Sequence, residues 1–405
     1  MQEHPMKNDT ATNDLTFSVE NLGSVRSGSF TPKPLTLFCG PNNSGKTWVM
    51  YALNHCYYGL SFLAQGSWKE ERKPSLPAVE PLFAQNLQAF NDRCNSYLQN
   101  TVFNIPEEQL SNPRIYLEST LSLPKIIADW GVLSPFLMPA ERNGLHLFFR
   151  ELSARRAALL HQVSHKGIDM ERLLRNVIRS PYAAPIAEYI NWLNRLFEIS
   201  NQHSADFHKL AEILEKTLAA GAYRMNPGTG SIVFKPHQTK QKDTTPELDL
   251  HATASSVKSL FGLWFYLRHQ AKKGDVLMID EPELSLHPRH QRAIARLLAR
   301  LVNAGLRVVV STHSDYIVRE INTLLMLGES AAEDLQKKHA YDQAETLKTD
   351  QVAAYLFDEG TIKEFEVTPD DGIYASTFDE VIDDLNRVNN DIYYSLQERR
   401  EQEND

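Results

Sequence analysis

Three stretches of the chain contain short, unbroken runs of apolar residues, the pattern of strands that are buried on both faces of a sheet. They lie within Leu35–Cys39, Asp275–Asp280 and Arg307–Ser311. Helix-compatible segments follow the first two runs, one from Lys46 to about Tyr58 and the other over Arg289–Ala304. Strands that alternate with helices in this way predict an α/β fold around a mainly parallel sheet.

Strand patterns also occur near both ends of the chain. Leu15–Val19 alternates apolar and polar residues, which is typical of a half-buried strand. Gln351–Asp358 and Thr361–Val367 predict a closing strand pair that turns at Glu359-Gly360. Leu147–Ala219, in contrast, is helix-compatible almost throughout.

A glycine loop joins the strand at Leu35–Cys39 to its helix, with the spacing G-x-x-x-x-G-K-T that is typical of a phosphate-binding loop. Its glycines let successive backbone N–H groups point inward at a polyphosphate. Lys46 is placed to reach the outer phosphates, and the Thr47 hydroxyl is placed to ligate Mg²⁺. The residues predicted to contact ATP are Gly40, Asn42, Asn43, Ser44, Gly45, Lys46 and Thr47.

The apolar run before Asp280 ends in two carboxylates, Asp280 and Glu281. The carboxyl ends of strands are where open α/β sheets place their ligands. Asp280 is predicted to hold Mg²⁺ through water, and Glu281 to orient or deprotonate the water that attacks the γ-phosphate. The alternative is an acidic strand end that caps the next helix.

A histidine, His313, follows the last of the three buried strands. Its place after the acidic pair indicates that it senses or holds the γ-phosphate of ATP. The alternative is a structural histidine.

Composition narrows the class of protein. The chain has 405 residues, a formal charge of −9 and three cysteines without C-x-x-C spacing. The charge argues against a general nucleic-acid coat, and the cysteines favour a reducing compartment without a disulfide framework. No run reaches 18 apolar residues and the first residues show no signal pattern, so we expect a cytoplasmic protein without a membrane span.

Together the glycine loop, Asp280-Glu281, the segment Leu284–Pro288 and Ser311-Thr312-His313 resemble the ABC-type ATPases of the RecF, SMC and OLD group. This resemblance implies an α/β ABC-type ATPase head in which ATP and Mg²⁺ lie between two heads packed head to tail. A signature segment of the second head then contacts the γ-phosphate, and here it corresponds to Ser255 and Ser256. The alternative is a plain helix cap. Pro139–Arg142 also resembles an OLD-like segment, with no role assigned.

The expected domain division follows from these patterns. Residues 1–59 form the N-terminal lobe of the ATPase core with the phosphate loop, and residues 221–375 form its C-terminal lobe. A mainly helical insertion spans residues 60–220 and includes a core strand near 133–145. Residues 376–405 form an acidic helical tail.

The resemblance suggests a function beyond ATP hydrolysis. Only 92 residues follow His313 (405 − 313), so no intrinsic nuclease is expected. Heads of this kind resemble the ATPase subunits of bacterial anti-phage systems, including Septu-like and retron-associated ones. We therefore expect a homodimer or higher homo-oligomer that acts as sensor or scaffold for a separately encoded effector, such as a nuclease.

Two other functions stay open. One is a DNA-repair or maintenance ATPase of the RecF kind, and the other is a transporter head, which would need a membrane partner. The basic segment Arg150–Arg179 is either a nucleic-acid contact or a solvated or partner-binding face, because Glu151, Asp169 and Glu171 dilute its charge.

Overall fold

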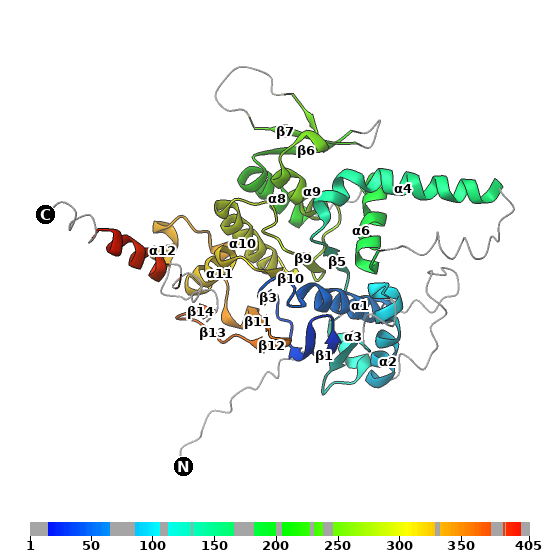
Figure 1. The fold of residues 1–405 in the computed structure, drawn as a ribbon, viewed down its shortest axis with the longest axis horizontal. Helices are drawn as coiled ribbons and strands as arrows, with labels where there is room; N and C mark the ends of the chain where they lie inside the picture. Colours follow the sequence, from blue (N-terminus) through cyan, green and yellow to red (C-terminus); the bar gives the residue numbers. More distant parts are fainter. Residues whose placement is uncertain are drawn as a thin grey trace, which may run out of the picture.

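A mixed sheet forms the centre of the molecule (Figure 1). The computed structural model describes residues 15–64, 86–105, 112–130, 133–165, 182–199, 205–226, 231–237, 246–328, 333–373, 384 and 386–397. Within them the main sheet has nine strands in the order β4-β1-β2-β12-β11-β3-β10-β9-β5. These strands are β1 (Thr16–Leu22), β2 (Val25–Phe30), β3 (Leu35–Cys39), β4 (Arg114–Glu118), β5 (Pro135–Met138), β9 (Val276–Asp280), β10 (Arg307–Thr312), β11 (Val352–Asp358) and β12 (Thr361–Glu364).

Helices cover both faces of this sheet. The helices of the described residues are α1 (Lys46–Ala64), α2 (Leu87–Tyr97), α3 (Leu123–Trp130), α4 (Arg142–His165), α6 (Ala184–Asn194), α7 (Leu196–Ile199), α8 (Ala205–Leu214), α9 (Ser255–His269), α10 (Pro288–Asn303), α11 (Asp315–Met326) and α12 (Glu333–Lys338). Single π-helical segments extend α2 (Leu98–Phe103) and α8 (Glu215–Ala219). Two small sheets complete the described fold: β6 (Gly221–Met225) with β7 (Ile232–Pro236) and β8 (Leu248–Asp249), and β13 (Val367–Thr368) with β14 (Gly372–Ile373).

The central strands β11, β3, β10, β9 and β5 run parallel to one another. Their residues alternate between two cores, which is why the sequence shows continuous apolar runs there. Leu35 and Leu37 of β3 belong to the core that contains α9, α10 and α11. Phe38 belongs to the core on the α1 side, with β1 and β2. The α/β prediction from the apolar runs is therefore confirmed.

Helix α1 is longer than its sequence indicated. Its predicted end near Tyr58 is wrong, because the helix continues to Ala64 and buries Leu60 and Leu63. Gly59, which weakens a helix in isolation, is accommodated because Phe90 of α2 packs against it, 3.1 Å from where a β-carbon would lie. Tertiary packing overrides local propensity here.

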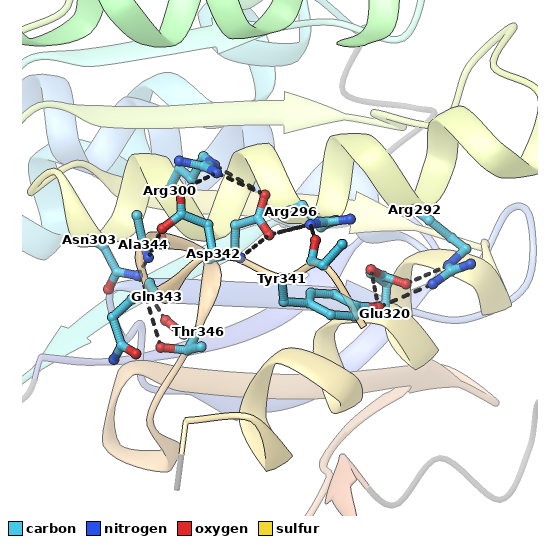
Figure 2. Close-up of polar contacts among 12 residues, drawn as sticks. Arg292, Arg296, Arg300, Asn303, Glu320, Tyr341, Asp342, Gln343, Ala344 and Thr346 are labelled. Atoms are coloured by element: carbon cyan, nitrogen blue, oxygen red, sulfur yellow. Dashed lines mark hydrogen bonds and ion pairs between the residues drawn. The ribbon is translucent and has the colours of Figure 1, made fainter. Parts of the chain in front are cut away.

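A ladder of arginines on α10 fixes the segment that leads into β11 (Figure 2). Arg296 and Arg300 both donate to the buried carboxylate of Glu345, at 2.5–3.1 Å. Arg292 donates to Glu320 of α11 at 2.5 Å, and Asn303 donates to two backbone carbonyls of the same segment. The side chains of α10 thus hold α11 and the segment that precedes β11. This segment in turn places β11 beside β3.

Glu345→Ala should therefore destabilise the fold. The change leaves Arg296 and Arg300 partly buried without a shared acceptor, and we expect a loss of about 2 kcal/mol of unfolding free energy. Chemical denaturation measures it. Glu198→Ala, in an exposed ion pair with Arg195, is the matched control and should stay within about 0.5 kcal/mol of wild type. Equal effects of the two changes would contradict a structural role for this ladder.

The first two turns of α4 are tied to α9 through a buried histidine. His146 Nδ1 lies 2.8 Å from the Lys258 carbonyl, and Nε2 lies 2.7 Å from the Tyr189 hydroxyl. A carbonyl only accepts, so Nδ1 carries the proton and Nε2 accepts from the tyrosine. Gly262 of α9 permits this approach, since a β-carbon there would lie 2.1 Å from the Tyr189 hydroxyl oxygen. Burial lowers the pKa of His146 to about 3.

The histidine should make stability depend on pH. Its folded pKa lies below the unfolded value of about 6.5, so as pH falls the unfolded chain takes up a proton that the folded chain excludes. Below pH 6, wild type should therefore lose about 1 kcal/mol per pH unit relative to His146→Gln. Denaturant titrations at pH 7, 6 and 5 measure this difference. A difference that does not change with pH would refute the buried neutral histidine.

Candidate functional site

The predicted phosphate loop lies between β3 and α1, at the carboxyl end of the parallel strands. Gly40 and Gly45 have φ values of +140° and +100°, a region that favours glycine. A β-carbon on Gly40 would lie 2.3 Å from the Phe357 carbonyl oxygen, and one on Gly45 would lie 2.6 Å from Val25. Asn43, at φ +62°, completes the tight curve. Both glycines are thus required by geometry as well as by the motif.

Lys46 is buried at the start of α1 and folds back over this loop. Its ammonium group donates to the carbonyls of Gly40 and Pro41, at 2.9 and 2.6 Å, and lies 3.4 Å from the Ser44 hydroxyl. Burial lowers its pKa, and the nearby carboxylates Asp280 and Glu281 oppose that shift. The ammonium group of Lys46 therefore lies against the loop, where the motif predicts that the phosphates bind.

The strand order brings the predicted magnesium residues together. β10 pairs with β3 on one side and with β9 on the other. Thr47 donates its hydroxyl hydrogen to Asp280 Oδ2 at 2.8 Å, and the Ser311 hydroxyl donates to Asp280 Oδ1. Burial raises the pKa of Asp280, and these two hydrogen bonds counteract the rise. Thr47 and Asp280, which are 233 positions apart in the sequence, thus belong to one polar centre.

Glu281 follows directly and has a constrained backbone. Its φ is +51°, which is uncommon for a residue with a side chain. Its N–H donates to the carbonyl and the hydroxyl of Ser311, at 3.1 and 3.2 Å. The side chain keeps 28% of its surface exposed, and its Oε1 lies 3.6 Å from His313 Nδ1. His313, 44% exposed, is therefore brought beside the predicted catalytic carboxylate.

A further acid, Glu283, was missed by the sequence analysis. It is 4% exposed, and its Oε1 accepts from the Thr312 hydroxyl at 2.8 Å and from the His313 N–H at 2.9 Å. The same oxygen lies 3.4 Å from His313 Nδ1. Its Oε2 is buried and has no hydrogen-bond partner among the described residues. The only sequence signal was its position two residues after Glu281, just before Leu284–Pro288.

Arg142 was also without an assigned role, although its segment had been singled out. It lies at the start of α4 and is 2% exposed. Its guanidinium donates to the carbonyls of both Asp280 and Glu281, at 2.7 and 2.6 Å. Sequence alone could not place it there, because 138 residues separate Arg142 from Asp280.

Ser255 and Ser256 lie in the first turn of α9. The N-cap residue is Ala254 and no side chain caps the helix, so the plain-cap alternative for the two serines is wrong. Ser255 is exposed and Ser256 half-buried. Among the described residues, no hydrogen bond joins either serine to the phosphate loop.

The chemistry of the donors fits Mg²⁺ bound together with a nucleotide. Mg²⁺ prefers oxygen ligands and keeps waters and phosphate oxygens in its shell. Thr47 and Asp280 supply one hydroxyl and one carboxylate within hydrogen-bond distance of each other. Among the described residues, no group of three or more His, Cys, Asp or Glu could hold a metal ion.

The basic segment Arg150–Arg179 is described only in part. The backbone of α4 is helical to His165, but residues 166–181 lie outside the described residues, as do the side chains of 155–165. Both interpretations of this segment, a nucleic-acid contact and a solvated or partner-binding face, therefore stay open. In the described part of the chain, no helix is both long and apolar enough to cross a membrane.

Comparison with known proteins gives one family and several structures. A family model described as an AAA ATPase domain matches residues 169–318, the part that carries Ser255, Asp280, Glu281 and His313. No curated protein matches the chain. The predicted enzyme class, an ATPase that binds and hydrolyses a nucleotide, is confirmed.

Similar solved structures include an SMC head domain from Thermotoga maritima (11% identity, TM-score 0.38, covering 88% of this chain and 100% of that one). An Smc head from Pyrococcus furiosus, bound to the C-terminal domain of ScpA, has 14% identity and a TM-score of 0.37 and covers 93% and 99%. The ATP-binding cassette of an ABC transporter in its ADP conformation has 11% identity and a TM-score of 0.31 and covers 89% and 93%. The α/β part of the fold prediction agrees with the sheet order and loop position described above.

Glu283→Gln tests the placement of His313. The amide keeps the size of the side chain but removes the charge that faces the imidazole, so the histidine should lose its fixed orientation. We expect kcat for ATP hydrolysis to fall on the order of tenfold, with the Kd for ATP unchanged.

The matched control is Glu333→Gln, an exposed glutamate at the start of α12. It should hydrolyse ATP at the wild-type rate. Unchanged kcat in Glu283→Gln would show that Glu283 serves only the fold.

Proposed function

We propose that this chain is an ABC-type ATPase head in which ATP and Mg²⁺ drive the association of two copies and hydrolysis separates them. One observation carries the proposal. Lys46, Thr47, Asp280, Glu281 and His313 meet at one sheet edge, whereas among the described residues no hydrogen bond joins Ser255 or Ser256 to them. In this proposal a second copy supplies these serines, as the resemblance to heads packed head to tail implies.

The residues of the site have distinct proposed roles. The loop N–H groups and Lys46 bind the phosphates, and Thr47 with Asp280 holds Mg²⁺, which neutralises charge on the phosphate oxygens. Glu281 orients the attacking water and accepts its proton. The water oxygen bonds to the γ-phosphorus as the bond to the β–γ bridging oxygen breaks and ADP leaves. His313 contacts the γ-phosphate and reports its presence.

The binding site and the catalytic group are separable in this scheme. Lys46 and Thr47 act on phosphates that ADP also carries, while Glu281 acts only on the attacking water. Substitution of Glu281 by Gln keeps its size and removes its basicity. Such a variant should bind ATP and remain associated.

Light scattering of Glu281→Gln, with and without ATP and Mg²⁺, tests this proposal. We expect its mass to double with ATP and Mg²⁺, while wild type associates only transiently. Lys46→Ala, which should not bind ATP, is the control and should stay single. A mass that ATP does not change in any of the three proteins would contradict the switch.

At the level of the cell, we propose a sensor or scaffold of a bacterial anti-phage complex with a separately encoded effector. The support for this role is the resemblance of stand-alone ABC-type heads, as a family, to such ATPase subunits, and it does not rest on any residue of this chain. The rival RecF-like role predicts strong DNA binding that weakens steeply with salt. A filter-binding series between 50 and 200 mM salt distinguishes the two.

A further inference from the structure

Arg142 is a buried cation whose hydrogen bonds go to backbone carbonyls. Nε donates to Ser259 O at 3.2 Å, and one terminal nitrogen donates to Pro139 O and Asp280 O, at 3.2 and 2.7 Å. The other terminal nitrogen donates to Glu281 O at 2.6 Å. Four bonds from one planar group join three segments of the chain: the end of β5, the loop after β9, and α9.

The loop after β9 needs such support. Glu281 has a left-handed backbone, and Pro282 follows it, which further restricts the conformations open to Glu281. Ser311 holds the N–H of Glu281 on one side, and Arg142 holds its carbonyl on the other. With both flanking peptides fixed, the direction in which the Cα–Cβ bond of Glu281 leaves the backbone is fixed as well.

The same guanidinium reaches the start of α9. Ser259, whose carbonyl accepts from Arg142, donates its own hydroxyl hydrogen to the Ser256 carbonyl at 2.9 Å. One turn further along α4, His146 contacts the Lys258 carbonyl. The first two turns of α9, with Ser255 and Ser256, are thus attached to the same residue that holds Glu281.

We propose that Arg142 is a positioning residue for ATP hydrolysis that couples the Asp280–Glu281 loop to the α9 turn bearing Ser255 and Ser256. This inference rests on the proposed function of Glu281. Arg142 binds the carbonyl side of the loop, so it acts through Glu281 and does not act on the phosphates. A shift of α9 when a second copy docks is thereby passed to the catalytic carboxylate.

The chemistry of the contact requires arginine. Only a guanidinium presents five N–H donors in a fixed plane, whereas a lysine at this position has three donors on a flexible stem. Burial lowers the pKa of Arg142, and the negative groups of Asp280, Glu281 and Glu283 oppose that shift. Arg142→Lys therefore keeps the positive charge but removes the planar arrangement of N–H donors.

The test is a kinetic comparison of Arg142→Lys, Glu281→Gln and the double variant. We expect Arg142→Lys to lower kcat at least about tenfold, with the Kd for ATP within about twofold of wild type. Because Arg142 acts through Glu281, adding Arg142→Lys to Glu281→Gln should cause no further loss. Arg195→Lys, at an exposed ion pair, is the matched control and should leave kcat unchanged.

Losses that multiply in the double variant, or an unchanged kcat in Arg142→Lys, would overturn the proposal. The kinetic comparison is independent of the association switch, because it measures only ATP turnover. If wild type hydrolyses ATP but never associates, the switch fails and the role of Arg142 stands.

A second measurement needs no variant and decides the case if Arg142→Lys does not fold. Hydrogen exchange of wild type is followed with ADP and Mg²⁺, at a dilution where light scattering shows single chains. Peptides covering 280–284 and 255–262 should change their protection together. A change at 280–284 with none at 255–262 would overturn the coupling.

Discussion

The parallel alignment of β3, β10 and β9 is the constraint on which the rest of the structure depends. In this register Cys39 lies opposite Thr312, and Ser311 lies opposite Asp280. The three strands therefore end together, and the groups that follow them meet although they are far apart in sequence. Without this register, Thr47 could not donate to Asp280, and His313 could not lie beside Glu281.

Two cores hold this register, one on each face of the sheet. Strands buried on both faces are mainly apolar in their middle, so the charged residues collect at the ends, where ligands bind. The arginine ladder of α10 adds a second restraint, because it fixes the segment that places β11 on the other side of β3. Stability and site geometry thus depend on the same packing.

Sequence patterns predicted the buried strands and the loop between β3 and α1, because their signals are local. Continuous apolar runs identify strands, and glycine spacing identifies a tight turn. The end of α1 was misjudged because Gly59 is stabilised by Phe90, a contact that local propensity cannot report. The roles of Arg142 and Glu283 were not predicted, because each role depends on partners that are distant in sequence and meet only in the folded chain. Arg142 meets carbonyls, which carry no side-chain signature in a sequence.

The central claim is that Glu281, held at this edge, performs the hydrolytic step. It is tested most directly by single-turnover hydrolysis of ATP in wild type and Glu281→Gln, with ATP binding measured in the same samples. The account predicts that the variant binds ATP as wild type does and hydrolyses it at least about a hundredfold more slowly. Hydrolysis within a few-fold of wild type, with binding intact, would contradict it.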